Sequence, residues 1–150
     1  MSTDQSAPTT VDAYIAAFAP EVQAIPTVKT TIWAGRTLSA LAILFLAFDT
    51  IIKVLNLAPA VEATTQLGYP ASLVITLGVL ELICLAIYSI PRTTVPGAIL
   101  LTGYLGGAIA TQVRAGSSLF SVVFPVIIGA LIWGGLFLRD ERLRALLLQR

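Results

Sequence analysis

Long uncharged apolar runs dominate this sequence and limit what the chain can fold into. Residues 93–113 contain no charged side chain, nor do residues 115–138, and the run 63–80 continues past a single Glu81 to Ile90. A helix needs roughly 20 predominantly apolar residues to cross a bilayer core of about 30 Å. The alternating pattern of an outer-membrane strand does not occur. These runs therefore predict membrane-spanning helices.

We predict four spans, at residues 31–54, 70–90, 95–113 and 118–138. The first span is interrupted by Arg36, Asp49 and Lys53. Pro70 lies near a first helical turn, where its missing N–H is harmless, and Pro91 ends the second span. Short connections make consecutive helices antiparallel neighbours. The predicted fold class is all-α, a four-transmembrane-helix antiparallel bundle.

The composition excludes several classes of protein. Apolar residues make up 57% of the chain and charged residues 11%, with a mean hydropathy of +0.90. Soluble domains usually carry about 25% charged residues. The net charge of +1 gives no electrostatic case for nucleic acid. With no His and one Cys, the chain cannot form a zinc cluster, a His-ligated haem or an internal disulfide.

The segments outside the spans differ from them in composition. Residues 1–30, rich in Thr, Ser, Ala and Pro, are predicted to be a cytoplasmic segment that is partly ordered or forms a short amphipathic helix. Residues 31–138 form the predicted membrane domain. Residues 139–150 are a predicted cytoplasmic basic tail, with arginines near anionic headgroups.

The basic residues predict the orientation of the chain. An even number of spans places both termini on one side. That side would hold Lys29, Arg36, Arg92, Arg139, Arg142, Arg144 and Arg150, and the other side Lys53 and Arg114. Because basic residues favour the cytoplasmic side, we predict cytoplasmic termini in a bacterial-type inner membrane.

Asp49 and Lys53 are four residues apart and therefore share one helix face. Ionisable side chains inside a span are costly and usually face the bundle interior or a wet cavity. Asp49 lies about 8 Å from the outer end of its span by helix rise. Two interpretations stay open: a structural ion pair at the interface, with Lys53 extending outward, or a pair that faces the interior.

Glu81 is the most unusual residue in the sequence. It lies roughly 16 Å below Pro70, close to the bilayer midplane. A charged lone carboxylate costs at least a few kcal/mol there, so Glu81 is expected to be neutral, hydrogen-bonded or both. Tyr104 reaches a similar depth and is its candidate partner, and Gly78 shares its helix stripe. Two interpretations of Glu81 stay open. It is a structural residue that hydrogen-bonds across helices, or it is a functional group that contacts a ligand or moves a proton.

Small residues recur at helical spacing in the last two spans. Gly103 and Gly107 form a small-xxx-small pair, and Ala130 and Gly134 form another. Such pairs let a neighbouring backbone approach closely. We interpret Gly78, Gly103, Gly107 and Gly134 as helix-packing residues, with a ligand groove beside them as the alternative.

The end of the third span is polar. Thr111, Gln112 and Arg114 lie at the depth expected for Asp49 and Lys53. Depth and facing are compatible with one polar network. The candidate ligand-binding or polar-network residues are Glu81, Tyr104, Asp49, Lys53, Thr111, Gln112 and Arg114, and we predict no catalytic residue and no metal ligand.

Several motifs resemble those of a known family. They are Leu44 to Lys53, Leu67-Gly68-Tyr69-Pro70, Leu77 to Glu81, Gly107 to Gly116 and Leu138 to Leu146. Over residues 31–147 the chain resembles the DoxX-like family of small four-helix membrane proteins. The family motifs map onto Lys53, Glu81, Thr111 and Arg114, and several members carry His where this chain has Gln112. For some relatives the resemblance implies association with sulfur or thiosulfate oxidation and quinone-linked redox complexes.

Three hypotheses of function remain open. The favoured one is a non-catalytic membrane subunit or accessory of a quinone- or sulfur-linked redox or stress-response complex, with a groove for a bound quinone or lipid and no redox centre of its own. The second is a small proton-coupled permease or lipid carrier that acts as a homo-oligomer. The third is a membrane acid–base enzyme, which a pocket joining Glu81 to Asp49 or Tyr104 would favour.

Overall fold

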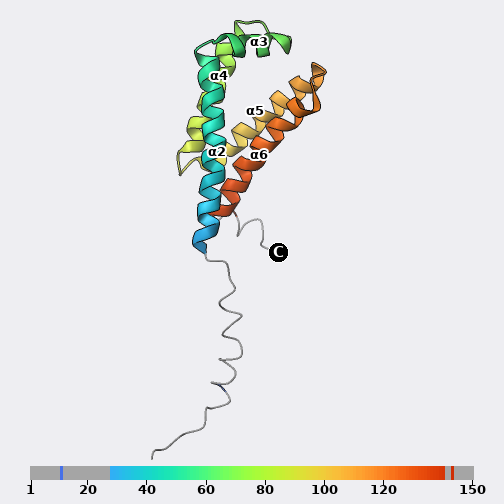
Figure 1. The fold of residues 1–150 in the computed structure, drawn as a ribbon. Coiled ribbons are helices and arrows are strands. Elements are labelled where there is room, and N and C mark those ends of the chain that lie inside the picture. Colours follow the sequence, from blue (N-terminus) through green and yellow to red (C-terminus); the bar gives the residue numbers. More distant parts are fainter. Residues whose placement is uncertain (1–10, 12–27, 141–142, 144–150) are drawn as a thin grey trace, which may run out of the picture.

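The chain is described by a computed structural model, which covers residues 28–140 together with positions 11 and 143. These residues form helices and no strand (Figure 1). The helices are α2 (Val28–Val54), α3 (Ala58–Gln66), α4 (Leu73–Ser89), α5 (Thr94–Arg114) and α6 (Leu119–Arg139). The predicted all-α fold class is confirmed. Nearly all of segments 1–30 and 139–150 lies outside the described residues, so what we predict for them stays a prediction.

The helix boundaries follow proline and capping chemistry. Helix α4 begins at Leu73 rather than at Pro70, because residues 70–72 form a turn in which the Leu73 N–H donates to the Pro70 carbonyl at 3.0 Å. Its far end is set by Ile90, which is extended because a residue before proline disfavours the helical region. Helix α6 begins after Ser118, whose hydroxyl accepts a hydrogen bond from the Ser121 N–H.

Helix α3 occupies the connection between the first two predicted spans. The chain turns at Asn56, whose φ of 53° lies in the left-handed region that Asn tolerates better than most residues. Pro59 then stands in the first turn of α3. The helix contacts α2 and α4 and lies across their ends (Figure 1). The predicted spans leave a long connection at about residues 55–69, for which we expected at most a short interfacial turn, although Pro59 is a signal for a helix start.

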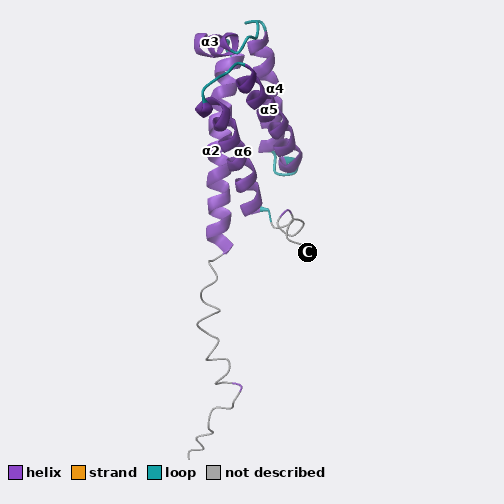
Figure 2. Cartoon of the chain, turned by 90° about the vertical axis from the view of Figure 1, so that its right-hand side faces the viewer, coloured by secondary structure: helices purple, strands orange, loops and turns teal. Residues whose placement is uncertain are grey.

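The four longer helices form a ring in which each contacts two neighbours. Helix α2 contacts α4 and α6, and α5 contacts the same two helices. Figure 2 shows α2 beside α6 and α4 beside α5. Side chains from all four helices fill the centre. The buried hydrophobic cluster comprises Ala42, Leu46, Cys84, Leu85, Tyr88, Ala98, Leu101, Leu105, Ile128, Ile132 and Leu136.

The ring is tight at the end where α2 begins. A side chain on Gly35 would collide with the Gly135 carbonyl, and one on Gly135 would collide with Ser39. A side chain on Gly97 would likewise collide with the backbone of Tyr88. From this tight end α2 and α6 diverge toward α3 (Figure 1). The helices therefore enclose a wedge that is widest beneath α3.

The outer surface of the ring is apolar. Helices α2, α5 and α6 are each long and apolar enough to cross a membrane, and 18-residue stretches within them have mean hydropathies of 1.9, 1.3 and 2.2. Helix α4 is also apolar but has 17 residues. Large side chains such as Leu44, Phe48 and Leu119 are more than half exposed, as suits a surface that meets lipid tails.

Candidate functional site

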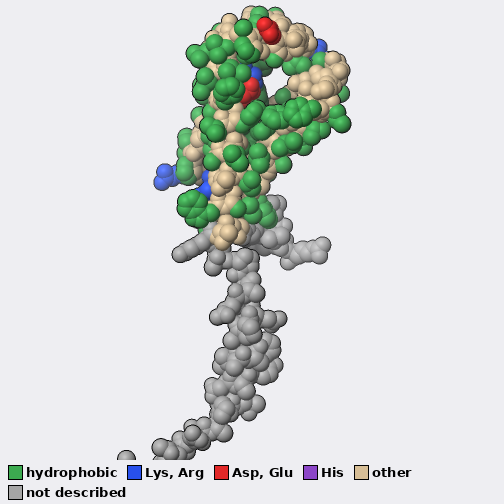
Figure 3. Space-filling model, in the orientation of Figure 1, with side chains coloured by type: hydrophobic (Ala, Val, Ile, Leu, Met, Phe, Trp, Pro, Cys, Tyr) green, Lys and Arg blue, Asp and Glu red, His purple; other side chains and the backbone are tan. Residues whose placement is uncertain are grey.

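A cavity of about 770 Å³ occupies the wide end of the ring. All five helices contribute to its wall, with α3 covering the end. The space-filling view shows the hollow beneath α3, between α2 and the α5–α6 hairpin (Figure 3). Most of the wall is apolar. The volume of the cavity lies in the range of small-molecule binding sites.

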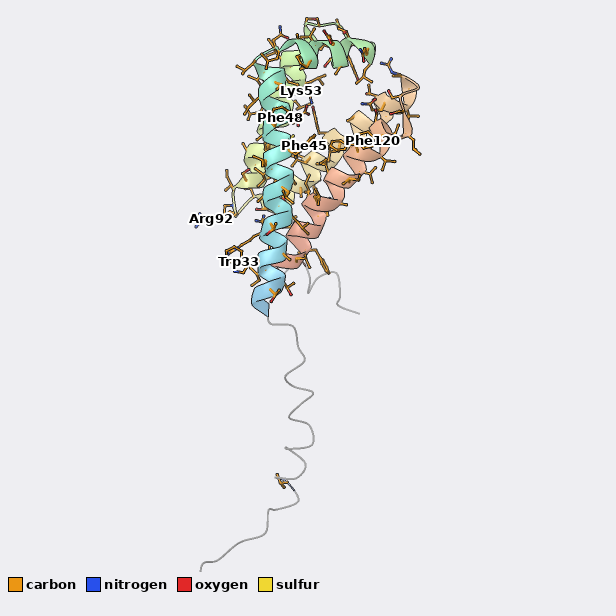
Figure 4. All side chains as sticks on the ribbon, viewed as in Figure 1. Trp33, Phe45, Phe48, Lys53, Arg92 and Phe120 are labelled. Carbon is orange, nitrogen blue, oxygen red and sulfur yellow. The ribbon has the colours of Figure 1, made fainter. Side chains whose placement is uncertain are left out.

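The Lys53 ammonium joins three helices on the wall of this cavity. It donates to Asp49 Oδ2 at 2.5 Å on its own helix, to Glu81 Oε2 at 2.9 Å on α4, and to the Tyr104 hydroxyl at 3.0 Å on α5. The Tyr104 hydroxyl in turn donates to Glu81 Oε2 at 2.9 Å. We refer to Asp49, Lys53, Glu81 and Tyr104 as the polar cluster. Figure 4 shows Lys53 extending from α2 toward the space beneath α3.

The two carboxylates of the cluster differ in exposure. The Glu81 side chain is fully buried, and its Oε1 atom has no hydrogen-bond partner among the described residues. The Asp49 side chain is 30% exposed and lines the cavity. Two carboxylates share one ammonium, so the cluster carries one uncompensated negative charge unless it holds a further proton. Asp49 is therefore the carboxylate that a molecule in the cavity can reach, and Glu81 is buried behind it.

Lys53 points inward, and this differs from the interpretation in which it extends outward to the interface. Its side chain is only 17% exposed. The physical reason is that a buried carboxylate and a phenol lie within reach on the neighbouring helices, whereas α3 covers the outward direction. The ammonium thus compensates Glu81 as well as Asp49.

A second polar group surrounds Tyr69, at the end of the connection that holds α3. The Tyr69 hydroxyl lies 3.0 Å from Thr111 Oγ1, and Thr111 also donates to the Gly107 carbonyl. Arg114 donates to the Leu67 carbonyl at 2.9 Å and lies over the Tyr69 ring. These contacts fasten the α3 connection to the end of α5.

The predicted polar-network residues therefore form two groups. The polar cluster holds four of them, and Thr111 and Arg114 instead contact Tyr69 and Leu67. Gln112 lines the cavity beside Thr111. Sequence reasoning did not select Tyr69 as a site residue, although an aromatic residue directly before the proline of a span was available as a signal.

Aromatic rings from α2 and α6 form part of the cavity wall. Phe45 on α2 meets Phe124 on α6 edge to face, with ring centroids 4.9 Å apart, and Phe120 lies 5.7 Å from Phe124. Phe45 and Phe120 lie on the sides of α2 and α6 that face the opening (Figure 4). The polar cluster thus faces an apolar, partly aromatic compartment.

The glycines selected for helix packing have different surroundings. Gly78 is buried, and a side chain there would collide with Lys53 and Val54. Gly134 makes only an ordinary contact with Leu38. Gly103 and Gly107 line the cavity, and no heavy atom of the described chain lies within 4 Å of where their Cβ would be. Gly103 and Gly107 therefore make no close helix contact within the described part of the chain, where the close contacts involve Gly35, Gly78, Gly97 and Gly135.

A second buried hydrogen-bond network lies outside the cavity. The Tyr88 hydroxyl lies 3.1 Å from Ser39 Oγ and 3.3 Å from the Ile132 carbonyl, and it thereby links α4 to α2 and α6. Sequence reasoning did not find this contact. The network belongs to the tight end of the ring and stabilises it.

These features define a helical membrane protein with a lined cavity and a buried charged cluster. The model of the DoxX-like family matches residues 37–135, which include every residue of the polar cluster. The chain belongs to the DoxX-like family, as the sequence motifs predict. Searches of curated proteins and of solved structures each return no match.

Proposed function

We propose that this chain is a four-span membrane protein that holds an amphiphilic ligand, an isoprenoid quinone or a lipid, in its cavity. In this proposal it serves as a non-catalytic membrane subunit of a quinone- or sulfur-linked redox or stress-response complex. The observation that carries the proposal is the cavity of about 770 Å³, largely apolar and with the polar cluster on one wall. A molecule with an apolar tail and a polar head matches such a wall.

The four-span topology rests on helix lengths and connections. Helix α4, at 1.5 Å per residue, is about 25 Å long, and the turn at residues 70–72 extends it. Short connections join α4 to α5 and α5 to α6, so these helices run antiparallel. Arg36, Arg92 and Arg139 lie near the ends opposite to α3, which supports cytoplasmic termini in a bacterial-type inner membrane.

A protease site placed at each terminus tests this topology. Both sites are expected to be cut in inverted membrane vesicles and protected in intact right-side-out vesicles. A matching site in the α3 connection, between Gln66 and Leu67, is expected to show the opposite pattern. Cleavage of a terminal site from outside would overturn the proposed orientation.

Extraction of co-purifying molecules tests the ligand. The full chain is purified in mild detergent, and bound quinones and lipids are quantified by mass spectrometry. The Gly103→Leu variant fills the cavity wall where space is open, whereas Gly106→Leu adds the same side chain at another open position that does not line the cavity. We expect Gly103→Leu to lose most of the bound molecule and Gly106→Leu to retain it. Equal occupancy in both variants would refute the cavity as the binding site.

The partner protein is the second part of the proposal. A chain with no His and one Cys lacks the ligands for a His-ligated haem or a Cys-ligated iron–sulfur cluster, so in this proposal another subunit transfers the electrons. Gentle solubilisation followed by absorption spectroscopy of the purified assembly is expected to show a flavin, haem or iron–sulfur signal. A homogeneous preparation from the native membrane with no such chromophore, in a homo-oligomer or a monomer, would count against a redox complex.

A membrane acid–base enzyme is the second candidate, and one observation favours it. The cavity joins Asp49, Glu81 and Tyr104, so a substrate would meet a carboxylate at the wall, with a second carboxyl group and a phenol behind it. Positioned carboxyl groups are general acids and bases for hydrophobic substrates. Turnover of an extracted ligand by the purified chain, and its loss in Asp49→Asn, would support this candidate over a binding subunit.

A further inference from the structure

The hydrogen-bond donors of the polar cluster are all used within the protein. The three N–H groups of Lys53 are directed at Asp49, Glu81 and Tyr104, and the single hydroxyl proton of Tyr104 is directed at Glu81. An ammonium has three protons and a phenol has one. A ligand that enters the cavity therefore finds no donor free in this cluster.

The acceptors of the cluster are not all used. Asp49 accepts the Lys53 hydrogen bond through Oδ2, and this half-buried side chain lines the cavity. Glu81, which also lines it, is fully buried and keeps Oε1 without a partner among the described residues. A carboxylate oxygen has about two lone-pair positions. The cluster therefore presents spare acceptor capacity, through Asp49 at the surface and Glu81 behind it.

The other hydroxyl groups on the wall are also paired within the protein. The Ser121 hydroxyl on α6 lies 3.0 Å from Ser118 Oγ. Thr111 donates to the Gly107 carbonyl, so the Tyr69 hydroxyl is the donor of the contact between these two side chains. Thr64 donates to the Ala60 carbonyl within α3. The Gln112 amide offers both a donor and an acceptor and so favours neither kind of head group.

From this donor and acceptor pattern, together with the largely apolar wall against which a charged head group is costly to bury, we infer that the cavity selects an uncharged amphiphile whose head group donates a hydrogen bond through a hydroxyl. The inference rests on the proposed ligand site and specifies its ligand class. A carbonyl head would bring an acceptor against the Asp49 carboxylate and leave both unpaired, and an anionic head would add a like charge. Two sources share the required chemistry: an isoprenoid quinol and a lipid with a free alcohol.

The test compares ligands that differ only at the head group. Decylubiquinol and decylubiquinone are titrated anaerobically into the full chain in phosphatidylcholine nanodiscs, and dioleoylglycerol and dioleoyl phosphatidic acid form the second pair. We expect the hydroxyl member of at least one pair to bind at least tenfold more tightly than its partner. Preference within the first pair assigns the quinol, and preference within the second pair alone assigns the lipid alcohol.

A variant of the contact residue tests the cause. Asp49→Asn supplies an amide N–H that can donate to a carbonyl, so the preference for the hydroxyl member is expected to fall at least fivefold. The control is Thr50→Val, which changes a buried residue of similar shape in the same helix turn that does not line the cavity. It is expected to leave the preference unchanged. The ratio of the two affinities within each ligand pair, measured on the unaltered chain, tests the inference even where Asp49→Asn does not fold.

Several outcomes separate this inference from the proposed function. Equal binding of quinol and quinone, with no preference in the lipid pair, would overturn the inferred preference for a hydroxyl head group. It would not contradict the proposed ligand site. Tighter binding of oleylamine than of either hydroxyl ligand would show that the site selects a positively charged head group, and this would also overturn the inference. Binding of none of these probes would count against the ligand site itself.

Discussion

Replacing Lys53 with methionine tests whether the polar cluster holds three helices together. Methionine keeps much of the apolar stem and removes the ammonium, which makes one hydrogen bond to each of α2, α4 and α5. Asp49 is 30% exposed and can be hydrated through the cavity, whereas the fully buried Glu81 keeps only the Tyr104 hydroxyl as a donor. The cost therefore falls mainly on Glu81.

The size of the loss follows from two estimates. At about 0.6 kcal/mol for each side-chain hydrogen bond in a membrane protein, the three bonds of Lys53 contribute about 2 kcal/mol. Leaving one partner of a buried ion pair uncompensated costs about 3–5 kcal/mol. Since Glu81 is the buried partner, we expect Lys53→Met to lower the free energy of unfolding by about 3 kcal/mol.

A double-mutant cycle separates lost contacts from uncompensated charge. The free energy of unfolding is measured by steric trapping in bicelles for Lys53→Met, Glu81→Gln and the double variant. Because Glu81→Gln removes the uncompensated charge, the double variant is expected to lose at least 1 kcal/mol less than the sum of the single losses. Losses that simply add, or a loss below about 0.5 kcal/mol for Lys53→Met, would refute the reasoning. Thr50→Val serves as the control for a buried change in α2 outside the cluster.

Three further predictions concern the rest of the fold. Gly135→Leu is expected to cost several kcal/mol in the same unfolding assay or to abolish folding, because it collides with α2, whereas Gly106→Leu faces open space and is expected to change stability by less than about 0.5 kcal/mol. Tyr88→Phe is expected to cost about 1 kcal/mol through its lost contacts, and an unchanged stability would contradict that role. Arg114→Ala removes the bond to the Leu67 carbonyl, so amide exchange in residues 58–69 is expected to accelerate while exchange in α6 does not.

Apolar runs and proline positions made most of the fold predictable. The limits of α2, α5 and α6 lie within three residues of the predicted spans, because charge and proline interrupt the sequence where the helices end. Helix α3 was less predictable, since its nine residues are weakly apolar and its place depends on the turn at Asn56. Helix pairing was the least predictable part. Many small residues occur in each span, and the pattern does not reveal that Gly35 and Gly135 are the pair that meets.

For the candidate site, the sequence predicted the depth of the polar residues in the membrane, but it did not predict the direction in which their side chains point. The depth of Glu81 predicts that it needs a partner, and a matched depth singled out Tyr104, which the structure brings within 2.9 Å. The inward direction of Lys53 depends on how α4 and α5 pack against α2, which a single helix pattern does not contain. The contacts of Tyr69 with Thr111 and Arg114 depend in the same way on the path of the connection after α3.

The tight and wide ends of the ring explain why the cluster is charged. Close contacts at Gly35 and Gly97 hold the helices together at one end, and the helices diverge toward α3, where apolar packing cannot fill the space. A long cationic side chain with three donors is one of the few groups that can link three diverging helices across such a gap. The structural and functional interpretations of Glu81 are therefore not exclusive. The contacts with Lys53 that stabilise the wide end also use up the donors of the cluster, and this leaves Asp49 as the acceptor that a ligand meets.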